Sequence, residues 1–227
     1  MYVTLSIDPA TPALTYRGPE SRQDATGARR LRTCAKGTTM FLEGDPATHV
    51  YEVVTGVLRL SRVLENGRRQ VIAFGLPGDI VGFPKADRYH TDCDVIAPAE
   101  LVAHRKGMLD ADAPDPDVHA RLLRSALREI SAMQDHFMML ARKSATEKVA
   151  SFLVALAHRT GVHIGTYTTL QLPMSRTDIA DFLGLTIETV SRIFTQLRKD
   201  GTITLQTAQT VLIRDMGALV DASEVGD

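Results

Sequence analysis

Apolar and polar positions alternate in short runs over the first half of the chain, and glycines separate these runs, as in VYEVVTGVLRLSRV and ENGRRQVIAFGLPGD. A period of two is typical of half-buried strands, and many short strands with regular turns favour a sandwich or roll. Asn66-Gly67 predicts a hairpin, because both residues tolerate the positive φ of a tight primed turn. We predict an antiparallel β-roll over residues 26–113, after a flexible arm over residues 1–25 that is rich in Pro, Thr, Ser and Gly.

A helical period replaces this alternation after residue 113. Asp115 can cap a helix that begins at Pro116, and no Pro or Gly interrupts the chain from there to Arg142. Apolar residues spaced by three and four form one seam along this helix: Leu123, Ala126, Ile130, Met133, Phe137 and Leu140. A second apolar edge contains Leu122, Leu127 and Met138.

A helix with two apolar faces needs two surfaces to cover them. A core helix of a monomer is one interpretation of this pattern. We favour another, in which one face packs on the roll of the same chain and the other face packs on a second copy. The sequence therefore predicts a dimerisation helix over residues 114–143, with the seam as the homodimer interface.

Three further helix starts follow in the last third of the chain. Ser144 and Ser175 each open a capping box, and Thr186 can cap another helix after the turn at Gly184. Two short helices around a glycine turn make a helix-turn-helix, whose second helix fits the major groove of DNA. The two β runs of TITLQTAQTVLIRD favour a wing. We predict a winged helix-turn-helix over residues 144–227, and an α+β fold for the whole chain.

Polar residues share one face near the start of that second helix, namely Glu188, Ser191 and Arg192. Arg192 can donate two hydrogen bonds to guanine O6 and N7, and Glu188 can accept one from the N4 amine of cytosine. The helix N-termini suit phosphates, which we assign to Ser175, Arg176, Thr186 and Thr189. The alternative is a surface ion pair between Glu188 and Arg192, worth about 0.2–0.5 kcal/mol.

Charge supports this placement locally. The net charge of the chain is −1, but residues 142–214 carry nine Lys and Arg against five acidic residues, a net charge of +4. Such a segment can form a DNA-binding face. We see no secretory signal and no apolar run of about 20 residues, so we expect a cytoplasmic protein without a membrane segment. Two cysteines, Cys34 and Cys93, make no disulfide framework.

With these parts in order, the chain resembles the superfamily of the cyclic-AMP receptor protein and the fumarate–nitrate reduction regulator (CRP/FNR) from about residue 30 to 215. IADFLGLTIETVSRIF carries most of the resemblance, with FLEGD, YEVVTGVLRL, ENGRRQVI and LPGDIVGF in support. The resemblance implies a transcription regulator, not an enzyme, that binds double-stranded DNA as a homodimer and contacts RNA polymerase. The E-T-V-S-R form is similar to the branch that binds TTGA-type half-sites, where Ser191 and Arg192 match base-contacting residues. Ile187 replaces an Arg of the cyclic-AMP receptor protein and suits a thymine methyl group.

Departures from the family pattern indicate the subgroup. In cyclic-nucleotide binders a Gly-Glu pair and an Arg-Ser pair hold the ribose and phosphate. Here Phe83 follows Gly82, and Thr91-Asp92 occupy the Arg-Ser place, so we expect no cyclic nucleotide. The oxygen-sensing branch holds a [4Fe–4S] cluster with four cysteines, and this chain has two. We therefore expect no cofactor and no metal. A member with this pattern most resembles the FixK group, which activates microaerobic, denitrification and nitrogen-fixation genes.

Four other hypotheses remain. A ligand-gated regulator of the same superfamily would sense haem, nitric oxide or another small molecule in the roll. His90 and Cys93 could form half of a metal or haem site, and either cysteine could act as a redox switch. A cupin-like metalloenzyme would need a histidine cluster on a strand, and the seven histidines contain no H-x-H.

Overall fold

The computed structural model describes residues 31–110 and 112–224. The arm predicted over residues 1–25 lies outside the described residues. The chain divides into two compact units, and the division between Ser131 and Ala132 falls inside a long helix. Each unit is described separately below. Within residues 31–110 and 112–224, no helix is both long and apolar enough to cross a membrane.

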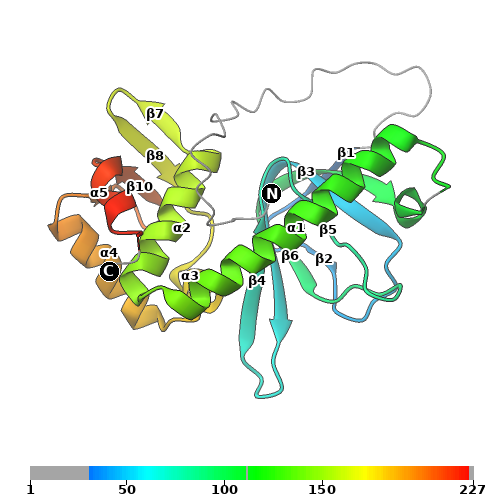
Figure 1. Cartoon of the computed structure of the whole chain (residues 1–227), viewed down its shortest axis with the longest axis horizontal. Coiled ribbons are helices and arrows are strands. Elements are labelled where there is room, and N and C mark those ends of the chain that lie inside the picture. Colours follow the sequence, from blue (N-terminus) through cyan, green and yellow to red (C-terminus); the bar gives the residue numbers. More distant parts are fainter. Residues whose placement is uncertain (1–30, 111, 225–227) are drawn as a thin grey trace. The chain divides into compact units, whose positions relative to one another are not determined.

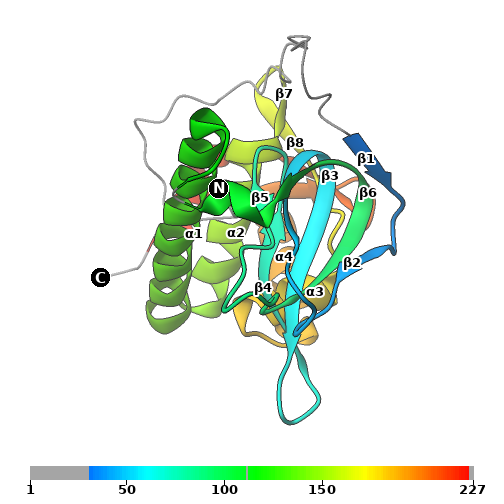
Figure 2. The ribbon, with the colours of Figure 1, turned by 90° about the vertical axis from the view of Figure 1, so that its right-hand side faces the viewer.

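The first unit is an antiparallel β-roll, as the alternating pattern predicts. Its strands are β1 (Leu31–Cys34), β2 (Thr39–Phe41), β3 (His49–Val63), β4 (Arg69–Gly75), β5 (Ile80–Val81) and β6 (Asp92–Arg105). Their order is β1-β6-β3-β4, with β2 paired to β6 and β5 paired to β3. Figure 2 shows the long strands β3 and β6 side by side. Gly56 is required in β3, because a Cβ there would lie 2.2 Å from the Pro98 carbonyl oxygen.

The hairpin between β3 and β4 forms where Asn66-Gly67 predicts it, but the turn type differs. The Gly67 N–H donates to the Leu64 carbonyl at 2.8 Å. Among the described residues Gly67 has a positive φ of 76°, whereas Asn66 does not have one. The primed turn that we expected needs positive φ at both residues. The observed turn is of the kind that ends in a left-handed glycine and joins slightly longer hairpins.

Helix α1 spans Pro116–Arg142, after a short 3-10 turn at Lys106–Leu109. The Asp115 carboxylate accepts from the N–H groups of Asp117 and Val118 at 3.1 and 3.0 Å, which confirms the predicted cap. Leu122 is buried with Val50 and Ile80 of the roll in one apolar cluster. Leu122 therefore packs on the roll, as expected for the edge of the helix opposite the predicted dimer seam.

The other side of α1 remains uncovered in the single chain. Four residues of the predicted seam are more than half exposed, at 51% for Leu123, 54% for Ile130, 52% for Met133 and 68% for Phe137. Ala126 and Leu140 are half-buried at its margin. Leu127 and Met138, which we placed on a second edge, are also exposed. The helix thus has one buried face and one apolar exposed face, and the exposed face is wider than the seam alone.

The second unit contains the remaining elements (Figure 1). These are α2 (Ala145–Thr160), β7 (Val162–Ile164), β8 (Tyr167–Gln171), α3 (Arg176–Leu183), α4 (Ile187–Lys199), β9 (Ile203–Leu205), β10 (Thr210–Ile213) and α5 (Met216–Asp221). The strands form an antiparallel sheet in the order β7-β8-β10-β9. The two β runs expected as a wing are β9 and β10. The sequence did not predict β7 or α5.

Candidate nucleic-acid interface

Helices α3 and α4 form the two-helix frame that the sequence predicts. The Ser175 hydroxyl accepts from the Asp178 N–H at 3.0 Å, and the Asp178 carboxylate accepts from the Ser175 N–H at 2.9 Å. Both bonds of the capping box are therefore present at the start of α3. Gly184 ends the helix in the left-handed conformation, with φ 64°. Thr186 then caps α4 by accepting from the Thr189 N–H at 3.2 Å.

One face of α4 is buried in the second unit. Its buried residues are Val190, Ile193, Phe194 and Leu197. On α3 the buried apolar residues are Ile179, Ala180, Phe182 and Leu183. Because the apolar residues repeat every three to four positions, burying them turns the intervening polar residues outward. The packing of α4 therefore decides which of its side chains can reach a partner.

The predicted base-contacting residues lie on this outward face. Glu188, Ser191 and Arg192 are exposed, and Ile187 is 42% exposed. Within the part of the chain that the structure describes, Arg192 forms no ion pair with Glu188. Instead, its Nη2 donates to the Thr189 hydroxyl at 3.2 Å. Both the carboxylate and most of the guanidinium N–H groups are thus available to base edges.

Three of the predicted phosphate-contacting residues contribute side-chain oxygens to the helix starts. Ser175 and Thr186 are exposed cap residues, and Thr189 is half-buried in the first turn of α4. Arg176 has a second role that the sequence did not reveal. Its guanidinium carbon lies 3.6 Å from the centroid of the Phe194 ring, so it joins α3 to α4 by a cation–π contact. Burial lowers the pKa of Arg176, which still remains charged at neutral pH.

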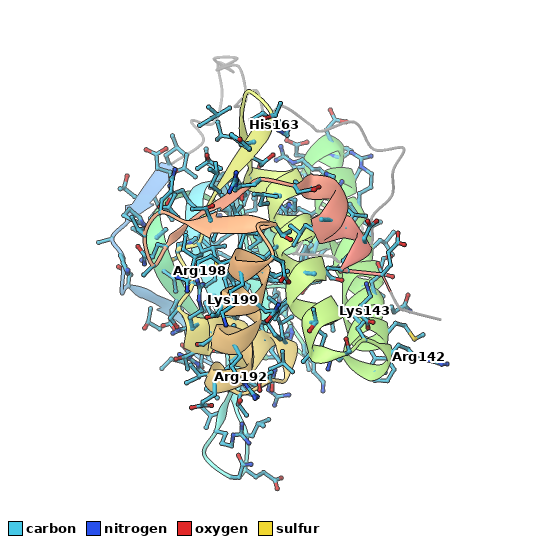
Figure 3. The ribbon with its side chains drawn as sticks, turned by 90° about the vertical axis from the view of Figure 1, so that its left-hand side faces the viewer. Arg142, Lys143, His163, Arg192, Arg198 and Lys199 are labelled. Atoms are coloured by element: carbon cyan, nitrogen blue, oxygen red, sulfur yellow. The ribbon has the colours of Figure 1, made fainter. Side chains whose placement is uncertain are left out.

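Basic side chains extend along the exposed side of α4. Figure 3 shows Arg192 toward one end of the helix and Arg198 and Lys199 toward the other, on the side that faces the viewer. Arg198 and Lys199 form its last turn and are exposed. The sequence reasoning counted their charges but gave them no role, because a basic pair at a helix C-terminus also has an ordinary explanation in the helix dipole.

The half-buried imidazole of His136 packs against helix α3. His136, in the part of α1 that belongs to the second unit, stacks on Phe182 of α3 with 4.2 Å between the ring centroids. Phe182 in turn contacts Phe152 of α2 at 5.8 Å. Burial lowers the pKa of His136 to about 4, and the Lys148 ammonium contributes to the same shift. His136 is therefore neutral at physiological pH and acts as a flat packing group.

Lys143 fixes the C-terminal segment of the same unit. Its Nζ donates to the Ser151 hydroxyl at 2.7 Å and to the Ser223 carbonyl at 2.6 Å, and both serines are buried. These bonds tie the end of α1 to α2 and to the residues that follow α5. No sequence signal marks Lys143, since one of its partners lies 80 positions away.

The residues that the resemblance places at the phosphate-holding pair of cyclic-nucleotide binders, together with their neighbour Tyr89, make contacts within the roll itself. The Tyr89 ring stacks on Phe41 with 3.8 Å between centroids, and its hydroxyl donates to the His49 carbonyl at 2.7 Å. Thr91 is 2% exposed. The Asp92 carboxylate accepts from the Glu43 N–H at 2.8 Å. The residues at the Arg-Ser place are thus buried or engaged within the roll.

A short turn lies close to these residues in the chain, between Lys85 and Arg88. Lys85 and Arg88 exchange two backbone hydrogen bonds, of 2.9 and 3.1 Å, around Ala86 and Asp87. Both central residues have positive φ, at 47° and 67°, which is the geometry of a primed two-residue turn. Neither is glycine, so the turn is strained and depends on outside contacts. One is the hydrogen bond from the Lys106 ammonium to the Asp87 carboxylate.

The cysteines and histidines of the roll form no metal centre in the described residues. Cys34 and Cys93 are buried at 4% and 0% exposure. Burial raises the pKa of the Cys93 thiol well above its usual range. The thiol is therefore protonated and inert at neutral pH. Across residues 31–110 and 112–224, no group of three or more His, Cys, Asp or Glu side chains could hold a metal ion.

Comparison with known proteins places this geometry in a family. Residues 147–222 match the Crp-like helix-turn-helix domain, and residues 31–109 match the cyclic nucleotide-binding domain. The nitrogen fixation regulation protein FixK of Azorhizobium caulinodans is 42% identical over 187 residues, which cover 82% of this chain and 75% of that protein. FixK of Rhizobium meliloti is 36% identical over 220 residues, covering 96% and 98% of the two chains. The structure of FixK2 from Bradyrhizobium japonicum matches with a TM-score of 0.78 and 32% identity, over 87% of this chain and 98% of that one.

The chain belongs to the CRP/FNR family of transcription regulators. It is a DNA-binding regulator with a helix-turn-helix domain and not an enzyme. Within the family it is FixK-like, as its similarity to the FixK proteins and to the FixK2 structure shows. The match to the cyclic nucleotide-binding domain establishes the fold of the roll. It carries no information about a ligand here, because the fold supports many sites.

Proposed function

We propose that this protein is a homodimeric transcription activator that binds TTGA-type palindromes and controls microaerobic, anaerobic or nitrogen-oxide-related genes. One observation carries the proposal. Glu188, Ser191 and Arg192 are exposed together near the start of a helix whose other face is buried in a helix-turn-helix. In such a frame the N-terminal half of the second helix reaches the base edges in the major groove.

Each side chain of this face has a partner of matching chemistry in a TTGA half-site. Arg192 donates to guanine O6 and N7, and Glu188 accepts from the cytosine N4 amine of the opposite strand. Ser191 hydrogen-bonds a neighbouring base, and the apolar side chain of Ile187 contacts a thymine methyl group. The phosphate contacts come from Ser175, Arg176, Thr186 and Thr189. They fix the register of the helix and carry no sequence information themselves.

The proposal of a homodimer is based on the exposed apolar side of α1. The helix has 27 residues and is therefore about 40 Å long. Its uncovered seam of Leu123, Ile130, Met133 and Phe137 repeats at spacings of three and four, which suits a second, identical helix. A dimer about a twofold axis would present two α4 helices to successive major grooves about 34 Å apart.

Ligand-free activity forms part of the proposal. The roll keeps Tyr89, Thr91 and Asp92 in internal contacts where a cyclic nucleotide would need a guanidinium for its phosphate. We therefore propose that neither cyclic nucleotide nor cofactor is needed for DNA binding. Activation also needs RNA polymerase as a partner. Relatives named as nitrogen fixation regulators and as the transcriptional activator FnrL of Cereibacter sphaeroides support the proposed targets and the direction of regulation.

Selection of bound oligonucleotides from a random pool tests the proposal. Purified full-length protein without added ligand should enrich palindromes of two TTGA-type half-sites, and transcription with RNA polymerase from such a promoter should rise. Enrichment of an unrelated motif would refute the base-reading scheme. Enrichment that appears only with haem, nitric oxide or a cyclic nucleotide would favour a ligand-gated sensor instead.

A further inference from the structure

A chain of hydrogen bonds connects the cap of α4 to its base-reading arginine. The Thr189 N–H donates to the Thr186 hydroxyl oxygen at 3.2 Å. The two threonine hydroxyl oxygens lie 3.0 Å apart. Arg192 Nη2 donates to the Thr189 hydroxyl oxygen at 3.2 Å. Three residues at successive spacings of three thus share one continuous polar path on the outward face of the helix.

Either hydroxyl can donate in the bond between Thr186 and Thr189, and donation by Thr186 leaves the Thr189 proton for DNA. A threonine hydroxyl has one proton to donate and two lone pairs that accept. The Thr186 oxygen already accepts a backbone N–H, so its proton can go to Thr189. The Thr189 oxygen then accepts from Thr186 and from Arg192, and its own proton remains free to point outward. A phosphate oxygen of DNA is the acceptor that suits this proton.

We propose that Thr189 is a positioning residue for DNA specificity, which holds the Arg192 guanidinium in place through its hydroxyl. The inference rests on the proposed function and deepens it, since it assigns Thr189 a second task beside its phosphate contact. An arginine side chain has several freely rotating bonds, and fixing it before binding lowers the entropy lost when it meets guanine. Thr189 would then contact the phosphate and Arg192 the guanine, while a hydrogen bond joins the two side chains.

The test is a double-mutant cycle on full-length protein with Thr189→Val, Arg192→Ala and the combination. Affinity is measured for a TTGA-type palindrome and for the same DNA with the guanine of each half-site replaced by adenine. Thr189→Val removes the hydroxyl at nearly constant volume. It should reduce the preference for guanine about fivefold, the usual effect of one hydrogen bond. In the Arg192→Ala background the same change should leave the remaining preference unaltered.

Two controls separate positioning from folding. Thr189→Ser keeps the hydroxyl and should restore the guanine preference. Thr195→Val removes a hydroxyl from the same helix that bonds the Ser191 carbonyl at 2.9 Å, and it should leave the preference unchanged. Thermal unfolding of every variant should show the same midpoint within about 2 °C.

Each other outcome overturns the inference. If Thr189→Val weakened guanine and adenine sites by the same factor, Thr189 would be a phosphate contact only. If its effect on preference persisted without the Arg192 guanidinium, it would act by another route. A wild-type protein with no guanine preference would overturn the proposed function as well. A preference that survives Thr189→Val would overturn the positioning role alone.

Discussion

The two units of this chain treat their functional surfaces in opposite ways. In the roll, the residues that the resemblance places at the ligand-holding pair are engaged within the chain, with Thr91 buried and the Asp92 carboxylate bonded to the Glu43 N–H. In the second unit, the side of α4 that would meet DNA remains exposed, with Arg192 free of any ion pair to Glu188 in the described chain. The difference supports a regulator that keeps its DNA-reading surface ready without a ligand in its roll.

The two units also differ in what holds these regions in place. In the roll, backbone hydrogen bonds and an exposed ion pair between Lys106 and Asp87 hold the strained turn at Ala86 and Asp87. In the second unit, packing holds the reading face from behind, through His136 on Phe182 and Arg176 on Phe194.

The largest expected effect comes from breaking the dimer. Ile130→Asp combined with Phe137→Asp places charges in the exposed apolar seam of α1, which a second copy would desolvate. We expect monomers in analytical ultracentrifugation and a loss of about 100- to 10,000-fold in affinity for the palindrome, because the second half-site is no longer held by the first. Arg128→Asp, an exposed position on another side of the helix, serves as the control. Dimers that persist in the double variant would show that the seam is not the interface.

A stability effect should follow from His136. Its folded pKa of about 4 lies below the unfolded value of about 6.5, so the unfolded state binds more protons between these pH values. The contribution of His136 to the free energy of unfolding should therefore be complete above about pH 6.5. It should be lost, by up to about 3 kcal/mol, as the pH drops to about 4. His136→Phe keeps the stack on Phe182 and should remove this part of the pH dependence.

Urea unfolding at pH 7 and pH 4.5 measures the His136 contribution. His90 of the roll also has a pKa lowered by burial, so some pH dependence should persist in the His136→Phe protein. Equal pH dependence in the wild type and in the variant would show that His136 is not buried as described.

A smaller and uniform effect is expected from Arg176. Arg176→Ala should weaken binding to all sequences alike, because a phosphate contact carries no sequence information. The slope of log affinity against log salt should fall by about 0.9, the value for one lost phosphate contact. Arg176→Lys keeps the charge but loses the planar contact with Phe194, so it should retain the salt slope. A change in base preference in either variant would contradict the assignment.

The smallest expected effect is that of added cyclic nucleotide. Cyclic AMP or cyclic GMP at millimolar concentration should change the affinity for the palindrome less than about twofold, because a ligand without preferential binding shifts no equilibrium. Fluorescence anisotropy with labelled DNA measures this directly. An increase of tenfold or more would show that the roll opens to admit a nucleotide, against the contacts of Tyr89 and Asp92.

The helix-turn-helix could be predicted well from the sequence, because each of its signals lies within a few neighbouring residues. The capping boxes at Ser144 and Ser175, the glycine turn at Gly184 and the helical period of α4 each need only a few neighbouring residues. The outward face of α4 followed from that period. By contrast, β7 has three exposed residues and no alternation, and α5 has only six residues, so neither leaves a periodic signal.

The features that the sequence did not predict depend on contacts between residues far apart in the chain. No spacing relates Arg176 to the Phe194 ring, or Lys143 to the Ser223 carbonyl. Leu127 and Met138 were grouped wrongly with Leu122 for the same reason, since only the roll shows which side of α1 it covers, and both residues are exposed. The prediction of the Asn66-Gly67 hairpin was correct in position and wrong in turn type, because the flanking strand register sets the loop length.

Arg192 is the residue on which the proposed sequence specificity depends most, because it would contact one guanine. The decisive measurement is the affinity of wild-type protein and Arg192→Ala for a panel of palindromes with every single-base change in the half-site. We expect Arg192→Ala to lose about 1–3 kcal/mol on the intact site and to become indifferent at that guanine, while preferences at the other positions persist. A uniform loss across the whole panel, with the guanine preference intact, would contradict the account.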